Sequence, residues 1–293
     1  MSTIYNSLAA QPSLTRTSLA AGLRALGAVI KKEWLIFVRY PSWIIALIVW
    51  PVIFPAAFIL GGRALSGPDG SGLQIFLKAA GTDNFLGYVG VGTTIWMWQN
   101  IVLWNVGFAL REEQMRGTLE SNWLSPTWRF SFLLGSSAVQ MVVMLLFLIV
   151  TAVEFIVFFG VRFHVNPGMV LLMLLVSIPS IYGIGFTFAS LVITAKEANT
   201  FVFLVRGLVM IFCGITFPLS VLPGWMQDVA RWLPPTYILH GLRSALLEGA
   251  GYKSLSSDVT ALLLFGVFWL GIGYLLFNWM EGRARRTGAI GQY

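Results

Sequence analysis

Long apolar stretches alternate with short polar segments along most of the chain. Six of these stretches are almost free of charged side chains, and they cover residues 43–60, 85–110, 130–160, 168–194, 201–217 and 259–280. About 20 apolar residues in a helix cross a bilayer core roughly 30 Å thick. The pattern therefore predicts an all-α, polytopic membrane protein whose six transmembrane helices lie in a domain at residues 43–280.

The composition supports a membrane protein. Charged residues make up 11% of the 293 residues and apolar residues 57%, whereas a soluble domain carries about 25% charged residues. Disordered and collagen-like chains are excluded, and so is a disulfide-stabilised fold, because Cys213 is the only cysteine. The net charge of +7 is better explained by basic loops beside a membrane than by nucleic-acid binding.

The basic residues also predict an orientation. An even number of spans places both termini on one side, and the segments on that side contain about two thirds of the 19 lysines and arginines. Because basic loops stay in the cytoplasm, we expect a multi-pass protein of the plasma (inner) membrane with cytoplasmic termini. Residues 1–22 are expected to form a flexible tail, and residues 281–293 a cytoplasmic C-terminal tail.

Residues 23–42 precede the first apolar run. At helical spacing their apolar side chains fall on one side and their basic side chains on the other. The pattern predicts an amphipathic helix that lies flat at the cytoplasmic interface. Either lipid anchoring or contact with a partner protein would explain such a helix.

Residues 111–129 form the one sizeable cytoplasmic loop between predicted spans. Two short helices are expected there, separated by Gly117-Thr118 and stopped by Ser125-Pro126. With Met115, Leu119 and Leu124 exposed, this loop would be a docking element for another protein. A capped, solvated loop is the alternative.

Residues 218–248 are expected to form an extracellular re-entrant helical hairpin between spans five and six. Prolines at 218, 223, 234 and 235 divide this segment into two short helices with apolar faces. Irregular backbone at membrane depth requires protein or a watery cavity around it. An interfacial cap on the bundle is the alternative interpretation.

A few polar side chains interrupt the apolar runs. The second run carries an aromatic and amide set that could line a translocation path or bond neighbouring helices, and both interpretations stay open. Its candidate path residues are Trp96, Gln99, Asn100, Trp104 and Asn105. The only charges within the six runs, Glu154 and Arg206, are functional candidates at membrane depth, although snorkelling or pairing would also explain them. Five glycines would permit close helix contact: Gly87, Gly90, Gly92, Gly183 and Gly185.

Several catalytic signatures are missing from the sequence. It contains no Gly-x-x-x-x-Gly-Lys-Ser/Thr phosphate loop, no His-Glu-x-x-His and no Gly-x-Ser-x-Gly elbow. The two histidines, His164 and His240, have no cysteines or carboxylates at metal-ligand spacing. We therefore predict no catalytic residue, no metal site and no cofactor in this chain.

Taken together, residues 25–280 resemble a permease subunit of the type-2 ABC exporter family. The first motif is Arg111-Glu112-Glu113-x-x-x-Gly117-Thr118-Leu119-Glu120, followed by Leu124-Ser125-Pro126. The later motifs are Phe217-Pro218, Leu222-Pro223-x-Trp225 and Leu233-Pro234-Pro235-Thr236-Tyr237. Each is loose alone, and their order on a six-span plan makes the match specific.

This resemblance implies roles for the segments outside the spans. The helix at 23–42 would be the connecting helix, residues 111–126 the coupling loop, and the hairpin at 218–248 the cap of the path. In the loop, Glu112, Glu113 and Glu120 would make polar contacts with a motor subunit. Leu119 and Leu124 would fill its groove, and Gly117-Thr118 would set the bend.

The resemblance also implies partners and a function. Two permease chains, identical or homologous, would pair above two ABC ATP-binding subunits that hold ATP and Mg, with membrane lipids around them. The expected function is ATP-driven export of a hydrophobic or amphipathic cargo, such as a drug, a lipid or a lipid-linked glycan. An ion-gradient-driven secondary transporter and a membrane-embedded lipid-modifying enzyme are the alternatives. The sequence leaves the identity of the cargo open.

Overall fold

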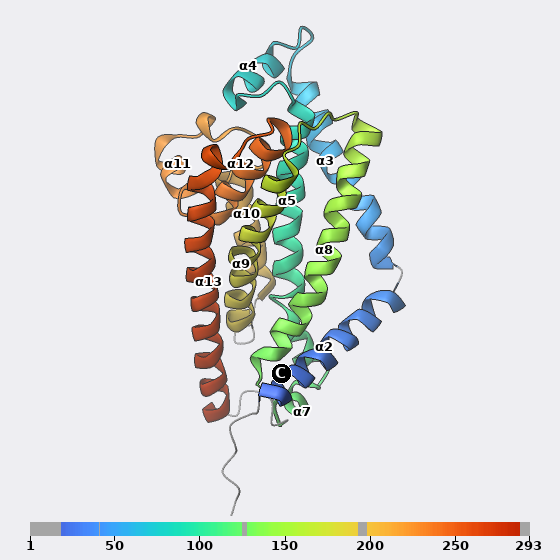
Figure 1. Cartoon of the computed structure of the whole chain (residues 1–293), viewed down its shortest axis with the longest axis vertical. Helices are drawn as coiled ribbons and strands as arrows, with labels where there is room; N and C mark the ends of the chain where they lie inside the picture. The colour runs from blue at the N-terminus through green and yellow to red at the C-terminus, as the bar shows by residue number, and fades with distance from the viewer. Residues whose placement is uncertain (1–18, 41, 125–127, 193–197, 288–293) are drawn as a thin grey trace, which may run out of the picture.

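The computed structural model describes residues 19–40, 42–124, 128–192 and 198–287, and every regular element in these residues is a helix. The long helices run side by side as a bundle, and short helices cover its two ends (Figure 1). In chain order the elements are α2 (Leu19–Arg39), α3 (Ser42–Leu65), α4 (Ser71–Ala80), α5 (Phe85–Asn105), α6 (Ala109–Met115), α7 (Leu119–Leu124), α8 (Phe130–Phe159), α9 (Pro167–Val192), α10 (Ala198–Phe212), the 3-10 turn η1 (Leu219–Val221), α11 (Gly224–Ala230), α12 (Pro234–Leu247) and α13 (Tyr252–Thr287).

Four helices are long and apolar enough to cross a membrane, namely α3, α8, α9 and α13. Helix α10 is apolar but shorter, and α5 has 21 residues that include amides, threonines and glycines. Each of the six predicted runs therefore coincides with a helix. The structure confirms an all-helical, multi-pass membrane protein with four candidate spans among the described residues.

Helix α5 occupies the centre of the bundle. It contacts α3, α8, α9, α10 and α12, and most of its side chains are buried. Glycines allow this close packing, because a Cβ added at Gly90 would lie 2.2 Å from the ring of Phe155 and one at Gly92 would lie 1.9 Å from the carbonyl oxygen of Ile215. The predicted role of the α5 glycines in helix contact is confirmed at these positions.

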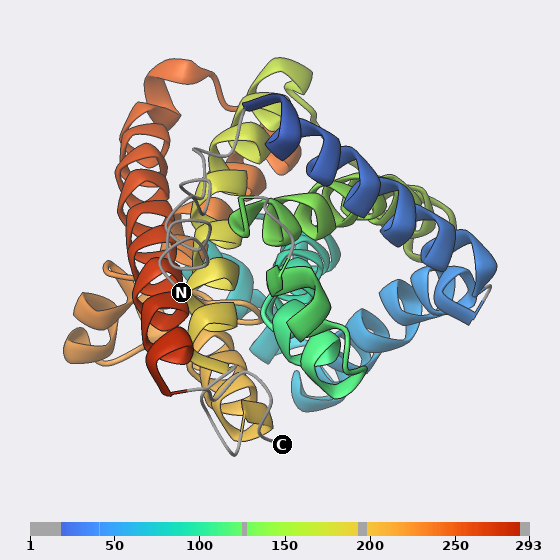
Figure 2. The same ribbon diagram turned by 90° about the horizontal axis from the view of Figure 1, so that it is seen from below.

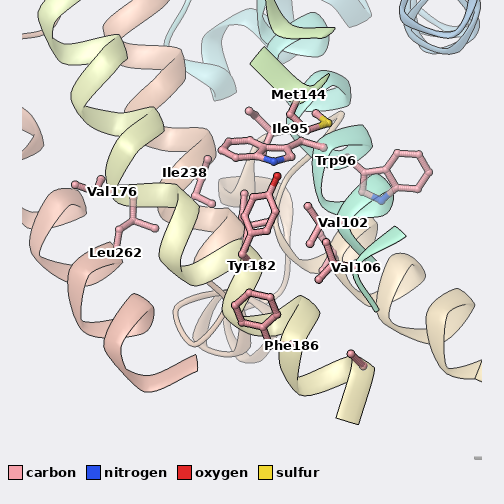
Figure 3. Close-up of a cluster of buried hydrophobic side chains, with 14 of the residues drawn as sticks. Ile95, Trp96, Val102, Val106, Met144, Val176, Tyr182, Phe186, Ile238 and Leu262 are labelled. Carbon is pink, nitrogen blue, oxygen red and sulfur yellow. The ribbon is translucent and has the colours of Figure 1, made fainter. Parts of the chain in front are cut away.

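Helices α9 and α13 form the most extensive contact between two elements. Gly183 lies against the backbone of Trp269 and Leu270, so a side chain there would separate the helices. Next to Gly183 on α9, Tyr182 and Phe186 point into the apolar core (Figure 3). The core therefore lies between α5, α9, α12 and α13, with α8 closing one side.

The short helices are divided between the two ends of the bundle. Helices α2 and α7 lie at the lower end in Figure 1, and α4, α11 and α12 at the upper end. Seen from below, α2 crosses the end of the bundle beside α8 (Figure 2). The amphipathic helix before the first span and the two helices of the 218–248 segment were expected from the sequence. Helix α4, between α3 and α5, was not.

Candidate functional site

The loop that was predicted to couple the chain to a partner forms an elbow of two helices. Helix α6 ends at Met115, and α7 begins at Leu119. Between them Gly117 has a φ of 70°, and its N–H donates to the carbonyl oxygen of Gln114 at 3.0 Å. This left-handed conformation favours glycine because a Cβ would be strained. The predicted bend at Gly117-Thr118 is confirmed.

Glu113 holds the elbow together from the inside. Its carboxylate forms an ion pair with Lys32 of α2, and it accepts hydrogen bonds from Thr118 Oγ1 at 2.6 Å and from Asn122 Nδ2 at 2.9 Å. The Glu113 side chain is only 14% exposed. The family resemblance implied a contact of Glu113 with a partner, whereas the structure joins it to α2, α6 and α7 of the same chain.

The two charges of this ion pair stabilise each other. Burial acts to raise the pKa of Glu113, but the hydrogen bonds from Lys32 and Thr118 outweigh it and hold the pKa below its ordinary value. Burial acts to lower the pKa of Lys32, and the hydrogen bond to Glu113 raises it above the ordinary value instead. Both groups are therefore charged throughout the neutral range, so α2 stays joined to α6 there.

The neighbouring coupling candidates differ in exposure. Glu112 is 45% exposed and bonds Arg116 at 3.0 Å, and Met115 is 60% exposed. The prediction that Leu119 is exposed and fills a partner's groove is wrong, because Leu119 is 2% exposed in the bundle core. The turn at Gly117 directs the first residue of α7 back against the bundle. The side chains of Glu120 and Leu124 lie outside the described residues.

The elbow is continuous with the long helices. Val29 of α2 packs against Gly135 of α8, where an added Cβ would lie 2.6 Å from a Val29 methyl group. Arg129, just before α8, forms an ion pair with Glu281 near the end of α13. Helices α2, α6 and α7 therefore form one body with the lower ends of α8 and α13, which we call the coupling face.

The candidate path residues of α5 divide into buried and partly exposed groups. Gln99 is 4% exposed and Asn100 8%, and Asn100 Nδ2 donates to the carbonyl oxygen of Trp96 at 2.8 Å. The amide oxygens of Gln99 and Asn100 have no hydrogen-bond partner within the described part of the chain. Trp104 and Asn105 are partly exposed. In this conformation the first group is buried among packed helices.

Arg206 of α10 lies beside Trp96 of α5. Its guanidinium carbon is 5.0 Å from the Trp96 ring centre and 5.5 Å from that of Phe203. The indole N–H of Trp96 donates to the Arg206 carbonyl oxygen at 3.2 Å, and the other ring neighbour is Phe54, stacked at 4.8 Å. Trp96 therefore connects α3, α5 and α10.

Glu154 lies on the inward side of α8. It is 6% exposed, and its Oε2 atom has no hydrogen-bond partner among the residues that the structure describes. Of the two alternatives that the sequence left open, snorkelling does not match this buried position. No salt-bridge partner of Glu154 lies among the described residues. Because α8 turns this side toward the bundle with Thr151 and Phe155, the carboxyl group is enclosed by protein.

Sequence reasoning did not single out Arg243. Arg243 is 9% exposed, and its guanidinium donates to the carbonyl oxygens of Gly214 at 2.9 Å, Ile215 at 2.7 Å and Tyr88 at 3.2 Å. It also lies over the Tyr88 ring at 3.5 Å. The helical spacing offered a signal, because Arg243 shares a face with Leu239 and Leu247, both apolar. This one side chain joins α12 to α5 and to the end of α10.

A cleft of about 860 Å³ lies at the upper end, among α4, the loop after it, the loop between α8 and α9, and the end of α12. None of the path candidates lines it, and its charged residues include Lys78, Asp83, Arg162 and Glu248. Across the described residues, no three His, Cys, Asp or Glu side chains are grouped as metal ligands.

A pH-sensitive contact joins α12 to α13. Nδ1 of His240 is 2.7 Å from Oδ2 of Asp258, whose side chain is 7% exposed. The hydrogen bond to Asp258 raises the pKa of His240 above its ordinary value, and this effect outweighs burial, which lowers the pKa. The charge of Glu248 raises the pKa further, and the charge of Arg243 lowers it. Because the pKa of His240 is raised by folding, its contact with Asp258 stabilises the folded protein fully below about pH 6.5. This contribution is lost as the pH rises through the pKa of His240 in the folded protein.

We therefore expect the thermal midpoint of the purified protein to decrease as the pH rises from 6 to 8. The decrease should be larger in the wild type than in the variant His240→Gln. The measurement is thermal unfolding in detergent across this range. The matched control is His164→Gln, which should keep the wild-type slope. An identical slope in wild type and His240→Gln would contradict the assignment.

Comparison with known proteins places the chain in a family. The profile of the ABC-2 family transporter proteins matches residues 62–275, from the last turn of α3 to the middle of α13. A search of curated proteins found no significant match. Because the profile covers most of the chain, including the coupling elbow and the helices around Arg243, the resemblance to type-2 ABC permeases is confirmed, and the chain belongs to the ABC-2 family of transporter proteins.

Proposed function

We propose that this protein is the permease of an ATP-driven exporter whose ATP and Mg are bound by a separate subunit. Membership in the ABC-2 family makes the chain a multi-pass membrane subunit of an ABC-type transporter, a class that works with an ABC ATP-binding partner. The proposal adds the direction of transport and the place where the partner binds. The observation that carries it is the coupling face, a rigid body with an exposed surface at one end of the bundle.

In this proposal α5 and α10 complete six spans. Helix α5 is surrounded by other helices, so its buried amide side chains face protein and not lipid. A span in this position can have a lower mean hydropathy than a span that faces lipid. Helix α10, with 15 residues, is about 22 Å long, and a short irregular segment leads from it to η1 and α11. Six spans place α2 and the end of α13 on one side of the membrane, consistent with their position at one end of the bundle.

The coupling face lies in the cytoplasm under this proposal. The positive-inside rule assigns the more basic end to the cytoplasm. Of the basic residues that the structure describes at the two ends of the bundle, most lie on the coupling face. These residues are Arg24, Lys31, Lys32, Arg39, Arg111, Arg116, Arg129 and Arg283. The cap formed by α11 and α12, fixed by Arg243, then lies outside.

The mechanism follows from the connections of Glu113. When ATP binding closes the partner subunits, a force on α6 reaches α2 through the ion pair of Glu113 with Lys32. It reaches α8 through the packing of Val29 on Gly135. Rigid helices transmit such a displacement as hinge or shear motion between two packings. The outer cap would then open and release a hydrophobic or amphipathic cargo, such as a drug, a lipid or a lipid-linked glycan.

The two alternatives have less support. A secondary transporter uses relays of ionisable groups at membrane depth, and the six apolar runs contain only Glu154 and Arg206. A lipid-modifying enzyme needs a cluster of His, Asp, Glu or Arg at one membrane face, and the sequence motifs show none. Transport that continues without ATP but with an ion gradient would favour the secondary transporter.

Binding of the partner should depend on the exposed surface of α6. We expect Met115→Asp to weaken co-purification of an ABC ATP-binding subunit by at least about tenfold. Met115 is 60% exposed at the elbow, and a charge there would remove an apolar side chain from the contact with that subunit. The measurement is pull-down of the co-expressed complex, with the ratio of the two subunits quantified.

The matched control is Ile75→Asp, which places the same charge on an apolar side chain that is 70% exposed on α4, at the other end of the bundle. This variant should bind the ATPase like wild type. Equal binding by Met115→Asp and wild type would refute the assignment of the coupling face. The same preparation tests the expected stoichiometry of two permease chains to two ATP-binding subunits.

A further inference from the structure

Arg206 is a cation at membrane depth that lacks an anion among the described residues. It lies six residues before the end of α10, about 9 Å from that end along the helix axis. Its Nε atom is buried and has no hydrogen-bond partner within the described residues, and its guanidinium contacts aromatic rings of Trp96 and Phe203. A charged side chain at this depth destabilises the protein unless a partner compensates its charge.

The described chain offers no carboxylate to fill this role. Helices α3, α5 and α10, which meet at Trp96, contain no aspartate or glutamate. The one acid in the six apolar runs, Glu154, is 6% exposed inside the bundle on α8. A second copy of the chain would therefore present no acid from α3, α5 or α10 to Arg206. Among the described residues of α3, α5 and α10 no anion compensates Arg206, which leaves room for an anion from another molecule.

The surroundings of Arg206 indicate what kind of molecule this is. On α10, Phe203 is 60% exposed, Leu204 56% and Leu208 44%, so the side chains next to Arg206 form an apolar surface that faces away from the bundle. On α5, Met97 and Ile101 are partly exposed. A ligand held here would place a charged group against the guanidinium and an apolar body along α10.

We propose that Arg206 binds the anionic group, a carboxylate or phosphate, of an amphiphile whose apolar tail lies along the exposed face of α10. The planar guanidinium suits both groups because it can donate two parallel hydrogen bonds to their oxygens. Trp96 positions it, since the indole is fixed by its stack on Phe54 and by its hydrogen bond to the Arg206 carbonyl oxygen. This inference rests on the proposed function, for which it narrows the cargo class to anionic amphiphiles.

The test compares two probes that differ only in charge. Spin-labelled stearate and its methyl ester are added to the purified permease in phosphatidylcholine nanodiscs, and electron paramagnetic resonance measures the immobilised, protein-bound fraction of each. We expect the carboxylate to bind about tenfold more tightly than the ester, as for a hydrogen-bonded charge pair. Arg206→Gln should remove this preference, and Arg206→Lys should keep part of it.

The controls separate binding from folding. Arg231→Gln removes a cation that is 72% exposed on α11 and should leave the preference unchanged. Unchanged binding of the ester to Arg206→Gln shows that this variant is folded. Equal binding of the acid and the ester to wild type, or a preference retained by Arg206→Gln, would overturn the proposal. Because the assay contains neither ATP nor a partner subunit, its result does not depend on the coupling assignment.

A second arm distinguishes cargo from a resident membrane lipid. Spin-labelled phosphatidic acid replaces stearate, and the ATPase subunit and ATP are then added to the nanodiscs. Release of the bound probe on ATP addition supports an anion site on the export path. Retention supports the same site filled by a resident anionic lipid.

Discussion

Replacing Arg243 with leucine should destabilise the folded protein by more than the loss of any exposed ion pair. The carbonyl oxygens of Gly214 and Ile215, in the loop after α10, would lose their donor, and each unpaired buried carbonyl costs about 1–3 kcal/mol. The carbonyl oxygen of Tyr88 would lose its second donor and keep its bond within α5. Removing a buried cation recovers part of this cost, so we expect a net loss of about 2–4 kcal/mol. The thermal midpoint in detergent, followed by size-exclusion chromatography after heating, measures the effect.

Two further variants make this prediction specific. Arg231→Leu changes the same residue type on α11, where the side chain is 72% exposed, and should leave the midpoint almost unchanged. Arg243→Lys keeps the charge but lacks the planar fork, so its midpoint should lie between those of wild type and Arg243→Leu. If Arg243→Leu unfolds at the wild-type temperature, the three carbonyl groups do not depend on Arg243.

Replacing Glu113 with alanine should separate α2 from the elbow. The variant loses the ion pair with Lys32 and the hydrogen bonds from Thr118 and Asn122, which come from three segments of the chain. Charge-assisted bonds of this kind contribute about 2–3 kcal/mol together when one partner is partly exposed, so opening should become roughly fiftyfold more frequent. Hydrogen–deuterium exchange of the amides in residues 19–39 and 109–124 measures the opening.

The neighbouring carboxylate is the matched control. Glu112 lies on the same helix, is 45% exposed and bonds only Arg116 among the described residues, so Glu112→Ala should leave exchange in α2 unchanged. Similar exchange in Glu113→Ala and Glu112→Ala would show that the α2 contact does not depend on Glu113. If the coupling proposal is correct, Glu113→Ala should also reduce ATP-driven transport while the ATPase still binds.

Much of the fold could be predicted because the signals are local. Apolar runs long enough to cross a bilayer fix where the long helices lie, and the six predicted runs each coincide with one. Gly117 marks the bend between α6 and α7 because its left-handed backbone excludes most other residues. Pro234 begins α12, because in the first turn of a helix proline gives up no backbone hydrogen bond. These features depend on residues a few positions apart.

The candidate site could be predicted only in part, because its geometry depends on distant contacts. The sequence located the predicted coupling loop but not which of its side chains face outward. The rotation of a seven-residue helix about its own axis depends on the elements that it packs against. Glu112 and Glu113 are adjacent, but Glu113 turns inward to pair with Lys32, 81 residues away, and with Thr118 and Asn122. The same reason explains why Leu119 is buried.

What the sequence determined by itself is the kind of protein: a helical membrane subunit with an amphipathic helix, a bent loop and two short helices in the segment 218–248. What only the tertiary structure decided is which polar groups meet. Arg243 and Tyr88 are separated by 155 residues, and Arg206 and Trp96 by 110. Helix period and turn chemistry act within one or two turns, whereas a buried charge is compensated by whatever segment the packing brings beside it.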